Sequence, residues 1–118
     1  MLITNAAVFT GTAFDASLLV RLENGRVTEA GRALTPDPGE ESLDFSGDYL
    51  LPGLVESHIH GLMGHDAMRG EADVRAMSRD LRALGVAAFC PTTMSASDED
   101  TRAALAGIRA VIDRKSVV

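Results

Sequence analysis

The sequence has little of what marks several large classes of protein. Only one cysteine, Cys90, occurs among 118 residues, which excludes an internal disulfide and fits a reducing compartment. We expect its side chain to be a small buried apolar group. Basic residues are also few, because eleven Lys and Arg stand against seventeen Asp and Glu and give a formal charge of −6. This acidic balance argues against a nucleic-acid partner and against an anionic membrane surface.

Long apolar runs are absent as well. No stretch approaches the roughly 20 apolar residues that a membrane-spanning helix needs, and the start, MLITNAAVF, lacks the basic flank and apolar core of a signal peptide. We therefore expect a cytoplasmic protein without a membrane segment. The chain has the length of about one domain, and its 46% hydrophobic residues are enough to form a core.

Residues 1–49 predict a small antiparallel β domain. We expect its short strands at 2–9, 18–23, 26–30 and 43–45. The pair Asn24-Gly25 separates two runs that alternate apolar and charged residues, and this arrangement predicts a hairpin because both turn positions need a positive φ. A segment rich in proline and glycine, 34–41, predicts a turn on the surface.

Residues 50–118 predict alternating strands and helices. We expect a buried strand ending at His60, a helix over 71–84, a strand over 86–94 that is covered on both faces, and a helix after Ser97. Gly85 should end the first helix and Ser97 should cap the second. Such alternation implies an α/β domain with parallel strands and helical crossovers.

Each expected helix has an apolar stripe at spacings of three and four. The buried stripes should be Val74, Met77, Leu81 and Leu84 in the first helix, and Leu105, Ile108, Val111 and Ile112 in the second. Arg114 and Lys115 should favour the negative C-terminal end of the second helix.

Two histidines stand at the C-terminal tip of the first strand of this region. Because side chains on a strand alternate with a period of two, Glu56, His58 and His60 share one side. Neutral imidazole is a common ligand of transition metals, and two imidazoles on one side can converge on one ion. A pair bonded only to backbone is the alternative. The apolar strand with its Pro52-Gly53 entry favours metal binding, because parallel barrels keep reactive groups at that position.

Two stretches resemble a known family. Pro52-Gly53 followed by His58-Ile59-His60 resembles the first-strand signature of the amidohydrolase superfamily, which comprises metal-dependent hydrolases on a (β/α)8 TIM barrel. Residues 60–68, HGLMGHDAM, together with 85–93, GVAAFCPTT, are similar to N-acetylglucosamine-6-phosphate deacetylases. The resemblance implies that 1–49 is the N-terminal part of a β-sandwich. It also implies that 50–118 forms the first two βα units of an incomplete barrel.

What the resemblance implies about function is hydrolysis of N-acetylglucosamine 6-phosphate to glucosamine 6-phosphate and acetate. A divalent ion, zinc or iron, would be the cofactor, and His58 and His60 match the histidines that serve as its ligands. Some members replace this pair and hold one metal elsewhere. The family's later ligands and its catalytic aspartate have no counterpart here, so the chain contains no catalytic residue of its own. We expect the chain to be inactive alone and to form a homo-oligomer that covers its strand edges.

Five further residues are candidates for positions close to the metal or the substrate. Glu56 could orient an imidazole, or it could pair with a basic group. His65 could reach the substrate or a metal, or it could be a solvated loop residue. Thr92 and Thr93 could donate hydrogen bonds at the barrel mouth, or they could only satisfy backbone. Gly61, directly after the histidine pair, would lie near the substrate.

Two other functions remain open at this stage. The first is a dihydroorotase-like cyclic amidase, although the uncharged loop 61–64 lacks the arginine that such enzymes tend to place after the pair. The second is a metal-binding or oligomerisation module without catalytic activity, which would use His58, His60 and His65.

Overall fold

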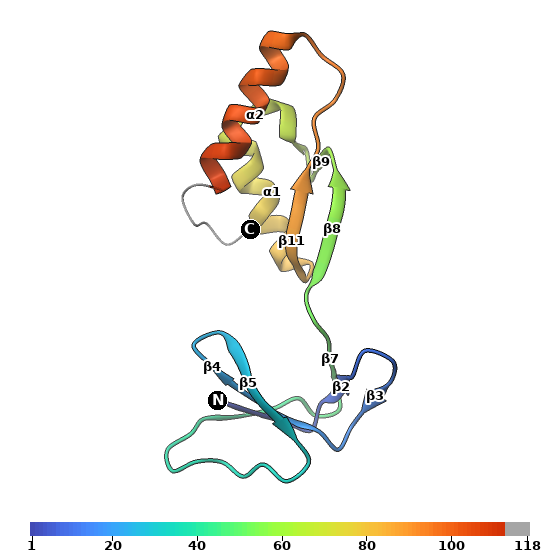
Figure 1. Ribbon diagram of the computed structural model, residues 1–118, viewed down its shortest axis with the longest axis vertical. Helices are drawn as coiled ribbons and strands as arrows, with labels where there is room; N and C mark the ends of the chain where they lie inside the picture. Colours follow the sequence, from blue (N-terminus) through green and yellow to red (C-terminus); the bar gives the residue numbers. More distant parts are fainter. Residues whose placement is uncertain (113–118) are drawn as a thin grey trace. The chain divides into compact units, whose positions relative to one another are not determined.

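The computed structural model describes residues 1–112, which form two compact units (Figure 1). The first unit is Met1–Pro52 and the second begins at Gly53. The sequence placed the division after residue 49, whereas the structure keeps the next few residues with the first unit. The reason is that Leu50 pairs with Val8 inside that unit.

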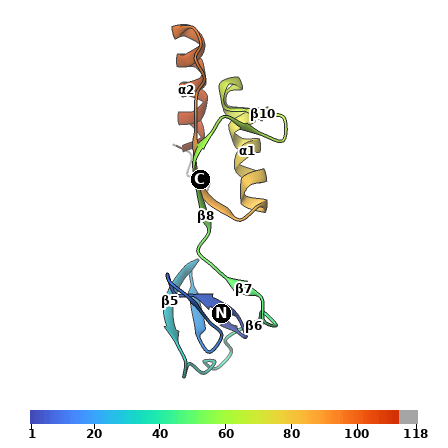
Figure 2. The same ribbon diagram turned by 90° about the vertical axis from the view of Figure 1, so that its right-hand side faces the viewer.

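The first unit consists of seven short strands in two sheets (Figure 2). Their bounds are β1 Leu2–Thr4, β2 Ala7–Phe9, β3 Phe14–Asp15, β4 Leu19–Glu23, β5 Arg26–Gly31, β6 Ser42–Asp44 and β7 Tyr49–Leu50. The sheet orders are β5-β4-β1-β6 and β3-β2-β7. The expected hairpin joins β4 to β5, and Asn24 and Gly25 have φ of 51° and 74°.

The first unit is mixed, so the expectation of a purely antiparallel domain is wrong. β6 lies parallel to β1, and β7 lies parallel to β2. Two features of the chain explain this. Asn5, with a φ of 55°, divides the expected strand 2–9 into β1 and β2, which belong to different sheets. The long segment 32–41 then returns the chain to the free side of β1, so β6 runs in the same direction as β1.

A buried arginine ties this long segment to the sheet. Arg21 on β4 is only 9% exposed; its Nε donates to Glu40 Oε1 at 3.0 Å and its Nη2 donates to the Thr35 carbonyl at 2.7 Å. The hydrogen bond from Arg21 lowers the pKa of Glu40 to about 2, and the Asp37 N–H contributes to this shift. The Met1 ammonium also lies 3.2 Å from Glu40. The sequence predicted only a surface turn over 34–41, because the composition of this segment does not indicate which of its carboxylates pairs with Arg21.

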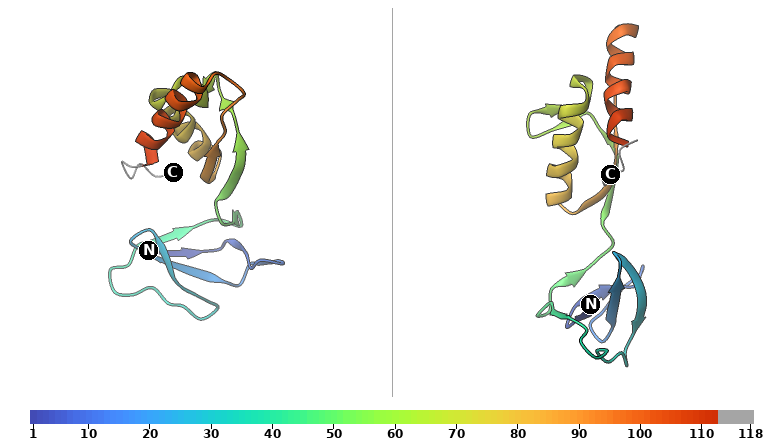
Figure 3. Two further views of the ribbon diagram at one scale, coloured as in Figure 1. Left: turned by 45° about the horizontal axis from the view of Figure 1, so that its top comes forward. Right: turned by 90° about the vertical axis from the view of Figure 1, so that its left-hand side faces the viewer.

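The second unit alternates strands and helices as expected. Its elements are β8 Leu54–Ile59, β9 Gly61–Leu62, β10 His65–Asp66, the short 3-10 helix η1 Ala67–Arg69, α1 Glu71–Ala83, β11 Val86–Pro91 and α2 Asp98–Ile112. β8 and β11 are parallel, and α1 connects them. Both helices lie on the same side of this strand pair (Figure 1) and next to each other (Figures 2 and 3). The observed α/β class is therefore the predicted one.

The ends of the helices agree with the sequence. Gly85, with a φ of 84°, follows α1, and the Asp100 N–H donates to Ser97 Oγ at 3.1 Å at the start of α2. The core of this unit combines both helices with the strands and contains Ala67, Val74, Met77, Leu81, Phe89, Ile108 and Val111. Arg114 and Lys115 lie outside the described residues. No helix within residues 1–112 is long and apolar enough to span a membrane.

Several residues expected to be buried are exposed. Leu54 and Val55 on β8 are 62% and 71% exposed. The others are Leu84, Cys90, Leu105 and Ile112. Leu84 follows α1, and Leu105 and Ile112 lie on α2 outside the core cluster. For Leu54 and Cys90 the reason is that the helices cover one face of the two-stranded sheet, and within the described part of the second unit no layer covers the other. The strand β11 is therefore covered on one face rather than two, and it ends at Pro91 rather than at residue 94.

We predict that Gly107→Ala destabilises the second unit. A Cβ at Gly107 would lie 2.5 Å from the Gly70 Cα and 2.6 Å from the Glu71 N, so two backbones rather than flexible side chains would have to separate. Helix propensity alone favours Ala by about 1 kcal/mol, whereas overpacking typically costs about 1–3 kcal/mol. With backbone atoms in contact we expect overpacking to dominate and the Tm to fall by several degrees.

The matched control is Ala106→Ser, an exposed position one residue earlier in α2. Thermal unfolding followed by far-UV circular dichroism compares the two variants. A Gly107→Ala protein more stable than the parent would show that the helices do not approach as closely as described.

We also predict a pH-dependent loss of stability in Glu40→Gln. Because the folded-state pKa of Glu40 is lowered from 4.5 to about 2, its contribution is complete above pH 4.5 and disappears as the pH falls towards 2. The variant should therefore have a lower Tm than the parent at neutral pH, and this difference should shrink between pH 4.5 and 2. Asp37→Asn, 3.7 Å from Arg21 and well exposed, should change the Tm much less. A Tm difference independent of pH would contradict the assignment.

Candidate functional site

The two histidines of the strand tip lie against each other. Ile59 packs against the helix core, so the alternation of side chains directs His58 and His60 to the opposite side of the strand. Their Nε2 atoms are 3.2 Å apart, and their rings are nearly perpendicular at 89°. The structure therefore brings the pair together on one side, as the spacing predicted.

Backbone contacts fix the orientation of His60. The ring Nδ1 lies 2.9 Å from the Thr92 carbonyl oxygen, which can only accept, so Nδ1 carries the proton and donates. The Thr92 N–H in turn donates to the Ile59 carbonyl at 2.8 Å, which continues the pairing of β8 with β11. In the neutral ring Nε2 therefore presents its lone pair towards His58. Histidines that bind metals commonly have this arrangement, with the second ring nitrogen bonded to a carbonyl or a carboxylate.

The geometry fits two ligands of one metal ion. Two nitrogens bound to a tetrahedral zinc at about 2.0–2.1 Å lie roughly 3.3–3.4 Å apart, and the observed separation of the Nε2 atoms is 3.2 Å. The residues described contain no group of three or more His, Cys, Asp and Glu that could hold a metal. Within residues 1–112 the pair would therefore supply two ligands, which is half of a tetrahedral set.

Glu56 supports the strand rather than an imidazole. Its Oε1 accepts a hydrogen bond from the His58 backbone N–H at 3.0 Å. Within residues 1–112 β8 pairs with β11 alone, so this carboxylate satisfies a donor of a strand that has one open edge. Glu56 thus holds the backbone at His58. It neither contacts a ring nor pairs with a basic group among the described residues.

His65 lies away from the histidine pair and faces α1. Its Nδ1 is 3.8 Å from Asp73 Oδ1, and its Nε2 is 3.9 Å from Asp80 Oδ2. It belongs to the small hairpin of β9 and β10, which was not predicted from the sequence. The pair Met63-Gly64 at the turn could have indicated this hairpin. Its φ values of 51° and 85° are similar to those of Asn24 and Gly25 in the turn between β4 and β5.

The other candidates have structural roles or no visible role. Thr92 Oγ1 donates to the Cys90 carbonyl at 3.0 Å, so the Thr92 side chain satisfies backbone while its own carbonyl orients His60. Among the described residues the Thr93 side chain has no hydrogen bond. A Cβ at Gly61 would collide with the His65 carbonyl oxygen, so glycine at this position permits the close pairing of β9 and β10.

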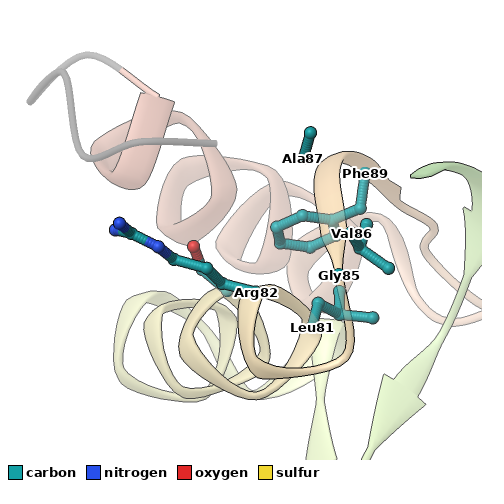
Figure 4. A pocket seen from close by; sticks show the side chains of 7 residues that line it. Leu81, Arg82, Gly85, Val86, Ala87 and Phe89 are labelled. Atoms are coloured by element: carbon teal, nitrogen blue, oxygen red, sulfur yellow. The ribbon is translucent and has the colours of Figure 1, made fainter. Parts of the chain in front are cut away.

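A separate hollow of about 300 Å³ lies at the other end of the strand pair. Leu81, Val86 and Phe89 form its apolar wall where α1 ends and β11 begins, and Arg82 extends outward beside it (Figure 4). The histidines are at the C-terminal end of β8, so this hollow does not adjoin them. It is a gap in side-chain packing and is separate from the histidine pair.

Comparisons of sequence relate the chain to enzymes of one superfamily. No protein-family profile matches the chain. A dihydroorotase of Trichlorobacter lovleyi is 35% identical over 86 residues, which is 71% of this chain and 20% of that enzyme. An N-acetylglucosamine-6-phosphate deacetylase of Vibrio furnissii is 47% identical over 60 residues, 50% of this chain and 15% of that enzyme. These relatives are amidohydrolase-superfamily hydrolases that act on carbon–nitrogen bonds.

Solved structures decide which fold this is. An N-acetylglucosamine-6-phosphate deacetylase from Pasteurella multocida superposes with a TM-score of 0.87 at 14% identity, over 98% of this chain and 31% of that one. A Mycobacterium smegmatis deacetylase, solved with N-acetyl-D-glucosamine-6-phosphate, superposes with a TM-score of 0.83 at 23% identity, over 100% of this chain and 30% of that one. The chain has the fold of the N-terminal region of N-acetylglucosamine-6-phosphate deacetylases. It spans less than a third of the length of these deacetylases.

We predict that the neutral His60 ring is protonated at Nδ1. The bond to the Thr92 carbonyl requires this tautomer, because a carbonyl oxygen can only accept. Long-range proton–nitrogen correlation spectra of the metal-free protein at mildly alkaline pH distinguish the two tautomers of each histidine. A His60 ring that carries its proton on Nε2 would contradict both the bond and the inferred direction of the lone pair.

Proposed function

We propose that this chain is the N-terminal part of a metal-dependent amidohydrolase that deacetylates N-acetylglucosamine 6-phosphate. The observation that carries the proposal is the pair of Nε2 atoms 3.2 Å apart at the C-terminal end of β8, in a chain with the deacetylase fold. Enzymes on parallel barrels place their reactive groups at that end of the strands. On this proposal β8-α1 and β11-α2 are the first two of eight βα units.

The histidines of this chain would hold the metal, which is zinc or iron. When bound, such an ion polarises an amide carbonyl and supplies hydroxide near neutral pH. In the neutral His60 ring the Thr92 carbonyl directs the proton to Nδ1 and leaves the Nε2 lone pair for a metal, while the Glu56 contact holds the backbone that carries His58. Among residues 1–112 no third ligand of a metal joins the pair, and the Glu56 carboxylate bonds to the His58 backbone N–H. We therefore propose that it does not hydrolyse the substrate on its own.

A dihydroorotase is the second candidate for the parent enzyme. The dihydroorotase match favours it, because it extends over 86 residues rather than 60. Two observations favour the deacetylase. The identity to the Vibrio furnissii enzyme is higher, at 47% against 35%. In addition, the loop after the pair, 61–64, contains no charged residue that could bind the carboxylate of dihydroorotate.

Two chimaeras test this proposal. In one, the chain replaces the N-terminal segment of the Vibrio furnissii deacetylase, and in the other it replaces that of the Trichlorobacter lovleyi dihydroorotase. We expect acetate release from N-acetylglucosamine 6-phosphate by the first and no turnover of dihydroorotate by the second. In the first chimaera His58→Ala and His60→Ala should each lower kcat/KM more than about 100-fold, because each removes a metal ligand.

The matched control is His65→Ala, which removes an imidazole that faces α1 and should change kcat/KM only a few-fold. Circular dichroism establishes that each chimaera is folded. Turnover of dihydroorotate in place of acetate release would transfer the assignment to the cyclic amidase. Full acetate release by the His58→Ala and His60→Ala variants would rule out a role for the pair in holding the metal.

A further inference from the structure

His60 is held at its backbone as well as at its ring. Its carbonyl accepts a hydrogen bond from the Ala67 N–H at 2.8 Å, while its ring donates to the Thr92 carbonyl. Ala67 is fully buried and begins η1, directly after the hairpin of β9 and β10. The position of His60 therefore depends on two segments, one that follows β11 and one that follows β10.

A carboxylate on α1 holds the end of this hairpin. Asp73 Oδ2 accepts a hydrogen bond from the Asp66 N–H at 3.0 Å, one residue before Ala67. The same oxygen lies 3.7 Å from Arg69 Nη1, and the other carboxylate oxygen lies 3.8 Å from His65 Nδ1. Figure 2 shows β10 next to α1. Asp73 thus contacts the chain on both sides of Ala67.

Asp73 makes these contacts instead of capping its own helix. It is the third residue of α1, a position from which a side chain often reaches back to the N–H of the residue that precedes the helix. That residue is Gly70, which has no side chain of its own to cap the helix. Within residues 1–112 the Asp73 side chain accepts from the Asp66 N–H and not from the Gly70 N–H. Its contacts therefore restrain the hairpin.

We propose that Asp73 is a positioning residue of the histidine pair, because its hydrogen bond to the Asp66 N–H places the Ala67 N–H that holds His60. The inference rests on the proposed function for the metal that His60 would bind, whereas the contacts do not depend on it. Among the described residues Asp73 contacts neither imidazole of the pair, so it acts through the hairpin.

The expected consequence concerns the His60 ring. When the Asp66 bond is lost, the Ala67 N–H no longer fixes the His60 carbonyl, and the ring no longer stays aligned with the Thr92 carbonyl. Its Nε2 lone pair then has no single direction. Partners that orient metal-binding histidines typically contribute about 10–100-fold to metal affinity, and we expect the lower end of this range for a residue that acts through the backbone.

The first test observes His60 in the metal-free 118-residue chain at mildly alkaline pH. Long-range proton–nitrogen spectra should show an Nδ1–H ring in the parent and a mixture of both tautomers in Asp73→Ala. Asp73→Asn should keep the parent spectrum, since its amide oxygen can still accept from the Asp66 N–H. The two variants therefore separate the hydrogen bond from the charge of the carboxylate.

Two control variants exclude less specific explanations. Asp80→Ala removes the other carboxylate near His65, at 3.9 Å, which accepts no hydrogen bond from the hairpin backbone within residues 1–112. Leu81→Val is a core substitution near the C-terminal end of α1 and should lower the Tm. Both variants should keep the Nδ1–H ring of His60. Far-UV circular dichroism verifies the fold of every variant.

The second test measures zinc affinity in the chimaera that contains the rest of the Vibrio furnissii deacetylase. By competition with a chelator, Asp73→Ala should weaken zinc binding by about 10-fold, and excess zinc should restore acetate release. Added metal would not restore activity that was lost through unfolding. Asp73→Asn and Asp80→Ala should bind zinc like the parent chimaera.

Several results would overturn the inference. An unchanged Nδ1–H ring in Asp73→Ala would do so, and so would an unchanged zinc affinity. An Asp73→Asn variant that behaves like Asp73→Ala would exclude the hydrogen bond as the cause, and the same spectral change in Leu81→Val would show that general destabilisation is sufficient. An inactive parent chimaera would instead contradict the proposed function, and the His60 spectra would still decide the role of Asp73.

Discussion

The pairing of β8 with β11 is the constraint on which the candidate site depends. The backbone hydrogen bonds between the two strands continue one step beyond β11, because the Thr92 N–H donates to the Ile59 carbonyl. That bond places the Thr92 carbonyl where it accepts from the His60 ring. In the neutral ring the direction of the lone pair on His60 Nε2 is thus set by backbone geometry, and a register shift between the two strands would move the imidazole away from His58.

The remainder of the second unit supports this strand pair from one side only. α1 and α2 meet closely at Gly70 and Gly107, and their apolar side chains enclose Phe89. The opposite side, which carries both histidines, has no covering layer among the described residues. The unit therefore has one face that the helices cover and one open face that carries the two histidines. The chemistry proposed for this chain belongs to that open face.

The sequence predicted the elements well where local signals are strong. Asn24-Gly25, Gly85 and Ser97 end or begin elements as expected, because turns and caps depend on nearby residues. Burial was predicted less well, since Leu105 and Ile112 follow the helical period but are more than half exposed in the described part of the chain. The ion pair between Glu40 and Arg21 and the orientation of His65 towards α1 were not predicted either. These contacts join residues that are separated in the sequence, and no local pattern indicates that they meet in the folded chain.

The thiol of Cys90 is accessible to chemical labelling. Side chains alternate between the two faces of β11. Phe89 is buried, so its neighbour Cys90, the one cysteine of the chain, lies on the other face and is exposed. It lies two residues before Thr92, whose hydroxyl bonds to the Cys90 carbonyl. A fluorophore or spin label attached to this sulfur would report from beside the histidine pair, and no competing thiol would have to be removed first.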